Sequence, residues 1–112
     1  MNEIIFSITI LADNENLEEY FFEKSNNDFI DLGKGISVFK ESSNNDQLIM
    51  KIEINKDETK LYDDSIRKIL LSNIIASWLV YKITGKKLSL LINNHPVPFK
   101  KNSLKNYVET LI

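Results

Sequence analysis

The chain has 112 residues, a length typical of a single domain. It contains no cysteine, which excludes disulfide bonds and thiolate metal ligands. Its net charge of −2 is the sum of an acidic N-terminal half and a basic C-terminal half. Up to Ile66 there are 15 acidic and six basic residues (net −9), and from Arg67 onward there are one acidic and eight basic residues (net +7). Such a division can indicate a nucleic-acid or membrane surface, or an attraction between two halves of one fold, and we favour the attraction.

The N-terminal half predicts three strands and a helix. Residues 3–11 alternate between apolar and polar side chains, which predicts a strand. They are not preceded by the basic region of a secretory signal, so we expect a cytoplasmic protein. Residues 15–25 have helical spacing, with Asp13 or Asn14 as the cap. Residues 36–38 and 48–54 alternate again around the turn-forming ESSNND, which predicts a hairpin, and Gly33 and Gly35 indicate a turn or bulge just before it.

The C-terminal half predicts three helices. The first extends from about Leu61 to Thr84, and Gly85 ends it. Residues 88–92 suggest a second, short helix, which NNHPVP breaks because two prolines in three residues cannot continue a helix. Asn102 or Ser103 caps the last helix. Its apolar positions have helical spacing and are Leu104, Tyr107, Val108, Leu111 and Ile112.

The predicted element order is therefore β-α-β-β-α-α-α. This order favours the α+β class, with a small, mainly antiparallel sheet of about three strands covered by helices. We expect residues 1–112 to form one domain, and the apolar end of the chain suggests that it is the N-terminal part of a longer protein.

Residues 69–81, ILLSNIIASWLVY, contain no charged side chain. On a helical wheel their apolar side chains point in nearly every direction, which predicts a core helix covered on several sides, with Trp78 buried. A membrane span requires about 18–20 apolar residues, and this run has 13. The sheet and the last helix can cover two sides, which leaves a third for another chain or domain.

The usual catalytic and metal-binding residues are scarce or unpaired. His95 is the only histidine, and we expect it in a solvent-exposed loop. The acidic pairs of the chain precede predicted helices, where capping and the helix dipole explain them without a metal. We therefore predict no catalytic residue, no metal, no cofactor and no enzymatic activity.

Six lysines are candidate interaction residues because they surround two predicted helix ends and the loop between them. They are Lys82, Lys86, Lys87, Lys100, Lys101 and Lys105. Lysines among aromatic side chains can bind nucleic acid, so a nucleic-acid-binding domain is the alternative function. The chain has a single arginine, however, and arginine usually makes the bidentate contacts, so we favour an ordinary solvated surface.

The chain ends on an apolar helix with no cap. An uncapped helix leaves carbonyl groups without partners, and exposed aliphatic side chains forgo burial energy. We therefore predict self-association as a symmetric homodimer. The residues expected near the contact are Leu104, Val108, Leu111 and Ile112.

The segment IRKILLSNIIASWLVYKITGKKLSLLINNHPVPFKKNSLKNYVETLI, residues 66–112, resembles the N-terminal half of the YtxC-like sporulation proteins of endospore-forming bacteria. The likeness covers nearly all 112 residues and is a pattern of apolar positions with an aromatic break at VPF. The chain departs from it at Lys100 and Lys101, where the family pattern has acidic residues. The resemblance implies a sporulation-associated protein with no established enzymatic activity. Together these features predict a non-enzymatic protein-interaction or structural module.

Overall fold

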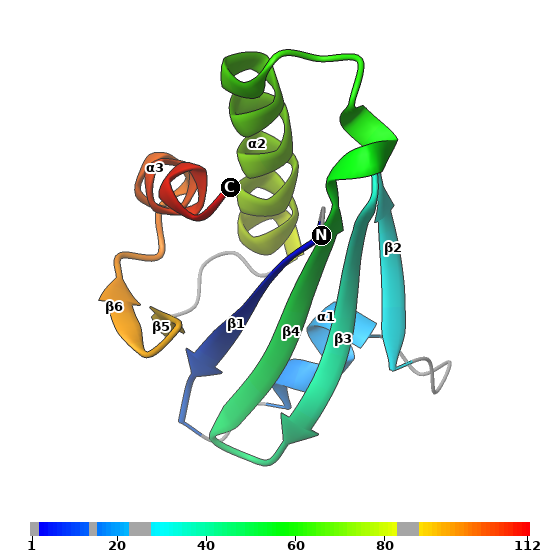
Figure 1. Cartoon of the computed structure of the whole chain (residues 1–112). Helices are drawn as coiled ribbons and strands as arrows, with labels where there is room; N and C mark the ends of the chain where they lie inside the picture. The colour runs from blue at the N-terminus through cyan, green and yellow to red at the C-terminus, as the bar shows by residue number, and fades with distance from the viewer. Residues whose placement is uncertain (1–2, 14–15, 23–27, 83–87) are drawn as a thin grey trace.

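The computed structural model describes residues 3–13, 16–22, 28–82 and 88–112. Within these residues a six-stranded sheet has the order β2-β3-β4-β1-β5-β6, and every neighbouring pair is antiparallel (Figure 1). The α+β class and the antiparallel sheet are confirmed, but the prediction of about three strands is wrong. The elements are β1 (Glu3–Leu11), α1 (Leu17–Phe22), β2 (Phe29–Gly33), β3 (Ile36–Ser43), β4 (Gln47–Asn55), the 3₁₀ helix η1 (Lys56–Thr59), α2 (Asp64–Lys82), β5 (Ser89–Ile92), β6 (His95–Val97) and α3 (Lys101–Leu111).

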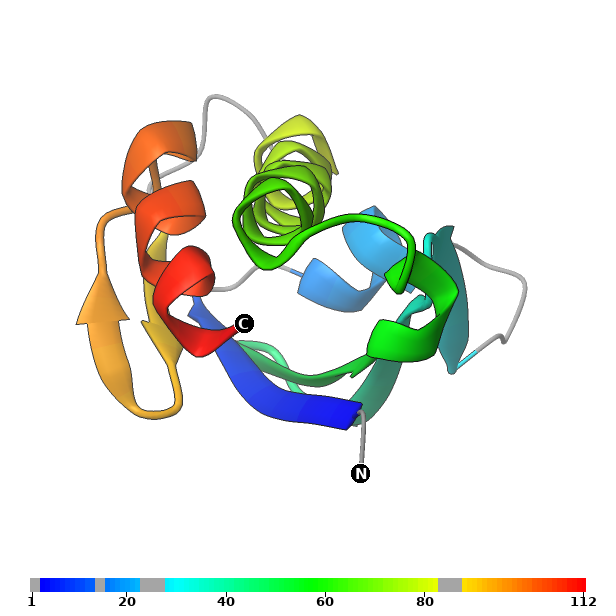
Figure 2. The same ribbon diagram turned by 45° about the horizontal axis from the view of Figure 1, so that its top comes forward.

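The centre of the sheet is the pair β1 and β4, in register from Glu3 opposite Asn55 to Leu11 opposite Gln47. Alternate residues of both strands point to one face and are buried. Figure 2 shows the three helices on this same side of the curved sheet. The core therefore lies between one sheet face and the helices, as the alternation predicts. Its strand residues include Phe6, Ile8, Ile10, Leu48, Met50, Ile52 and Ile54.

The predicted hairpin is confirmed as β3 and β4, and a further strand, β2, precedes it. The turn from β2 to β3 has positive φ at Gly33, Lys34 and Gly35. A Cβ at Gly35 would lie 2.5 Å from the carbonyl oxygen of Asn55, so glycine is required there. The sequence pattern missed β2 because Phe29 is apolar on the outer face, which breaks the alternation.

Lys40 joins three elements. Its ammonium pairs with Glu18 of α1 and lies 2.9 Å from a carboxylate oxygen of Asp28, beside β2. Hydrogen bonds to these two carboxylates raise the pKa of Lys40. The contacts tie α1 and the start of β2 to β3.

The short helix predicted at residues 88–92 is instead strand β5, and the predicted break contains strand β6. Leu90 and Ile92 are buried, and β5 pairs with β1. Asn93 and Asn94 both have positive φ, at 49° and 65°, as a two-residue type I′ hairpin turn requires. A short apolar run fits a helix or a buried strand equally well by periodicity, and only its pairing with β1 decides.

Helix α2 begins at Asp64, three residues later than predicted, and its predicted end at Thr84 and Gly85 lies outside the described residues. One side of α2 is buried, and the opposite side exposes Ile66, Ile69, Asn73 and Tyr81. The side of α2 that the sequence left for another chain or domain is therefore exposed in this chain. Trp78 is only partly buried, with its ring edge-on to Phe21 at 5.3 Å between centroids.

Helix α3 packs against α2 and begins with Lys100 in the cap position, in place of the predicted Asn102 or Ser103. Leu104 and Val108 are fully buried. The buried Ser72 of α2 donates to the carbonyl oxygen of Ile69 at 3.2 Å, so its hydroxyl is satisfied within the packed pair. None of the helices in the described part of the chain has the length and apolarity that crossing a membrane requires.

Candidate interaction surface

The described residues do not gather the predicted lysines into one exposed group. Lys100 and Lys101 are exposed at the start of α3, whereas Lys82 is half-buried. Lys105 is also half-buried and forms an ion pair of 3.1 Å with Glu109, one turn along the helix. The other two candidates, Lys86 and Lys87, lie outside the described residues.

The apolar residues predicted near a dimer contact are covered by the chain itself, two of them fully and two in part. Leu104 and Val108 have no exposed surface because α3 places them against α2 and the core. Leu111 and Ile112 are partly buried and pack on the same core. Leu104 and Val108 can therefore contact a second chain only if α3 leaves α2.

Exposed apolar side chains instead concentrate where η1 leads into α2. Of the large hydrophobic side chains found exposed among the described residues, four come from one nine-residue stretch. We call these four residues the Leu61 segment: Leu61 (95% exposed), Tyr62 (39%), Ile66 (50%) and Ile69 (54%). Sequence reasoning missed this segment because it placed Leu61 inside the helix. The sequence DDS, residues 63–65, could have indicated the true helix start, because two aspartates before a serine favour a helix that begins after Tyr62.

The loop that carries Leu61 is held by the side chain of Arg67, which is only 12% exposed. Its Nη2 donates to the carbonyl oxygen of Tyr62 at 3.2 Å and to that of Thr59 at 3.4 Å. Its Nη1 donates to a carboxylate oxygen of Asp64. Arg67 thus binds the backbone on both sides of residues 60 and 61.

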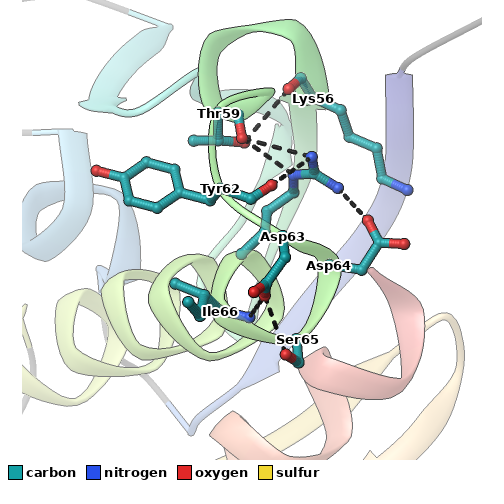
Figure 3. A network of polar contacts seen from close by, with 8 residues as sticks. Lys56, Thr59, Tyr62, Asp63, Asp64, Ser65 and Ile66 are labelled. Atoms are coloured by element: carbon teal, nitrogen blue, oxygen red, sulfur yellow. Dashed lines mark hydrogen bonds and ion pairs between the residues drawn. The ribbon is translucent and has the colours of Figure 1, made fainter.

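Two caps fix the ends of the same loop. Asp63 Oδ1 accepts hydrogen bonds from the Ile66 backbone N–H and the Ser65 hydroxyl, both at 3.0 Å (Figure 3). These bonds stabilise the carboxylate and lower the pKa of Asp63. At the other end, Asn55 Oδ1 accepts from the backbone N–H of Asp57 at the start of η1. The loop is therefore a defined structure that exposes a leucine.

A shallow cleft of about 570 Å³ adjoins the Leu61 segment. Leu61 and Tyr62 form its apolar lining. Its charged lining comes from the β2–β3 turn and from η1 with the residue after it, and consists of Lys34, Asp57, Glu58 and Lys60. An apolar centre with a charged border is the composition of a protein-binding surface.

His95 is exposed, as predicted, but it belongs to strand β6. Its ring stacks on Tyr107 of α3, with 5.0 Å between centroids and 7° between planes. Within the described residues no three His, Asp or Glu side chains are grouped closely enough to hold a metal ion.

Comparisons of the chain with protein-family models, with curated proteins and with solved structures found no match. The resemblance to YtxC-like proteins stays a prediction from the apolar pattern.

Proposed function

We propose that this chain is a non-enzymatic protein-interaction module whose partner protein binds the Leu61 segment. One observation carries the proposal: Leu61 is 95% exposed on a loop that Arg67 and two caps hold in place. A leucine left in water forgoes about 1.5–3 kcal/mol of burial free energy. A partner that covers it recovers this energy.

The rigidity of the loop supports binding because a surface that is already ordered loses less conformational entropy when a partner covers it. Ile66 and Ile69 lie one turn apart at the start of α2 and extend the apolar area from the loop onto a rigid helix. The charged residues around the cleft provide the polar border that such a surface needs for specificity.

The test compares Leu61→Ser with Tyr81→Ser. Tyr81 is 83% exposed on α2, but it lies twelve residues beyond Ile69, roughly 18 Å along the helix. Both side chains are exposed, so neither substitution should change the free energy of unfolding by more than about 0.5 kcal/mol.

Proteins captured by the tagged chain from its own cells are quantified by mass spectrometry. We expect Leu61→Ser to lower the recovery of specific partners about tenfold, which corresponds to about 1.4 kcal/mol of binding free energy, and Tyr81→Ser to leave it unchanged. Equal recovery with wild type and Leu61→Ser would contradict the proposal.

We further propose that this chain takes part in sporulation, because its apolar pattern resembles that of YtxC-like proteins, and that it acts in the cytoplasm. Spore counts of a strain that carries Leu61→Ser test this extension separately. If the variant loses partner binding but sporulates normally, the proposed role in sporulation is wrong and the proposed interaction module stands.

A further inference from the structure

The two edge strands of the sheet differ in whether another strand can join them. Strand β6 has three residues and pairs with β5 through Ile92 opposite His95 and Leu90 opposite Val97. In a two-residue hairpin Ile92 and His95 form a hydrogen-bonded pair. The backbone nitrogen and carbonyl group of the next residue, Pro96, therefore point away from β5, to the outer edge of the sheet. Proline has no N–H, and β6 therefore offers no outward donor at its centre.

The other edge, β2, has outward donors and acceptors. The backbone N–H of Lys40 donates to the carbonyl oxygen of Asp28 at 2.9 Å. In antiparallel strands hydrogen-bonded pairs alternate, so Ile30 also bonds to its partner Val38. The N–H and C=O groups of Phe29 and Asp31 consequently point away from β3.

An independent bond gives the same assignment. The backbone N–H of Asn55 donates to the carbonyl oxygen of Gly35 at 2.9 Å, which sets the alternation between β3 and β4. On that side Ser37 and Phe39 bond to β4, so Val38 must bond to β2. Among the described residues no backbone hydrogen bond to the outward groups of Phe29 or Asp31 is found.

We propose that a second copy of this chain pairs with β2 in antiparallel orientation, around a two-fold axis that passes beside Ile30. In this register Phe29 of each copy lies opposite Asp31 of the other. Each such pair exchanges two N–H···O=C bonds, so four bonds join the copies and all eight outward groups of Phe29 and Asp31 are satisfied. The edge of β2 is thus complementary to itself, as a symmetric dimer requires.

The side chains fit the same register. Ile30 lies opposite its own copy on the core side of the sheet, where it is half-buried in the single chain. Asp31 lies opposite the aromatic ring of Phe29, which is 46% exposed, so no two carboxylates are directly opposed. The Asp31 carboxylate also accepts a hydrogen bond from the Gly33 N–H at 2.8 Å, and Asp28 pairs with Lys40.

The pairing of two short β2 strands buries less than the 1,200–2,000 Å² of a standard stable interface. We therefore expect a weak dimer with a Kd of about 0.1–1 mM. Sedimentation equilibrium up to about 2 mM measures it. The informative variant is Asp31→Pro, which removes two of the four bonds while the pairing of β2 with β3 keeps its donors. Asp31→Ala is the matched control, because it also loses the carboxylate bond to Gly33 but keeps the N–H.

We expect Asp31→Pro to weaken dimerisation about tenfold or more and Asp31→Ala to change it about twofold at most. Unchanged dimerisation in a folded Asp31→Pro variant would overturn the proposal. So would a dimer that Leu61→Ser abolishes and Asp31→Pro does not, because that dimer would use the Leu61 segment.

A measurement on the wild-type chain serves if Asp31→Pro does not fold. Amide hydrogen exchange is followed by NMR at low and high protein concentration. Exchange of the Phe29 and Asp31 amides should slow as concentration rises, whereas the Ile30 amide, bonded to β3, should be protected throughout. A chain that stays monomeric at about 2 mM, or a dimer in which the Phe29 and Asp31 amides do not slow, would refute β2 pairing.

Discussion

Arg67 is the only arginine in the chain, and its planar guanidinium makes a set of contacts that a lysine ammonium cannot match. One side chain reaches the carbonyl oxygens of Thr59 and Tyr62 and the carboxylate of Asp64 at once. The five N–H groups of arginine form a fork with fixed directions, whereas lysine has one compact ammonium. The conformation of the loop that exposes Leu61 therefore depends on this residue.

Arg67→Lys should lower the free energy of unfolding by about 1–2 kcal/mol, because at least one carbonyl oxygen of the loop loses its charged donor. Urea unfolding measures the change, and the amides of residues 59–62 should exchange faster. Lys68→Ala, at the exposed neighbouring position, is the control and should be neutral. A neutral Arg67→Lys would mean that the loop holds its shape without the guanidinium fork.

Asp63 makes the start of α2 sensitive to pH. Hydrogen bonds from the Ile66 N–H and the Ser65 hydroxyl lower its pKa in the folded state. A carboxyl group with a depressed folded pKa contributes stability above its unfolded pKa and loses it as pH falls through the folded pKa. Asp63→Asn retains a capping oxygen and has no such dependence.

The wild-type chain should therefore be more stable than Asp63→Asn at about pH 6, and the difference should shrink below about pH 4. Urea midpoints of the two proteins, measured from about pH 6 down to about pH 2, test it. A difference that stays constant with pH would show that the ionised carboxylate adds nothing to the cap.

Among the elements, the β5–β6 hairpin owes its geometry to two adjacent asparagines. Both adopt the left-handed backbone conformation that asparagine tolerates better than most residues. Asn93 has a second role, because its Oδ1 accepts from the Ser7 N–H and its own N–H donates to the Ser7 carbonyl oxygen, both at 2.9 Å. The turn is thereby bonded to the side of β1.

The two asparagines should respond differently to substitution. Asn94→Gly should keep or raise stability by up to about 1 kcal/mol, because Asn-Gly is the preferred type I′ pair. Asn93→Ala should lower stability by about 1–2 kcal/mol, since it removes the bond to Ser7 and strains the backbone. Thermal unfolding of both variants tests this prediction. Similar losses of stability in both would contradict a type I′ turn.

Over the whole molecule, the charge division follows the order of the sheet. The acidic N-terminal half supplies β2, β3, β4 and β1, and the basic C-terminal half supplies β5, β6 and α3 on the other side (Figure 1). The ion pairs Lys40–Asp28, Lys51–Glu53 and Lys105–Glu109 each lie within one half, and Arg67–Asp64 joins the halves only where they meet in the sequence. These pairs leave the division between the two halves in place.

We expect this basic side not to bind nucleic acid at physiological salt, because the chain is acidic overall and few lysines are grouped there. Fluorescence anisotropy with random duplex and single strands, from about 50 to 200 mM salt, measures binding and its salt dependence. Sub-micromolar binding that is lost in Lys100→Glu/Lys101→Glu, but kept in Lys68→Glu, would establish the alternative function.

The sequence by itself determined the elements whose pattern is long and regular. Alternation over residues 3–11 and 48–54 predicted β1 and β4, and helical spacing from Leu104 to Ile112 predicted α3. In these segments the period assigns each side chain to a face, whatever the rest of the chain does. The prediction of a core between a sheet and helices followed from the same patterns.

Only the tertiary structure decided what covers each face. Residues 88–92 are short enough for either period, and they became a strand because β1 had an edge free to pair. The apolar surface of α2 is larger than the area that the sheet and α3 cover. Ile66 and Ile69 therefore remain exposed beside Leu61. The candidate surface could not be predicted, because the exposure of an apolar side chain depends on neighbours distant in sequence, whereas periodicity reports only those nearby.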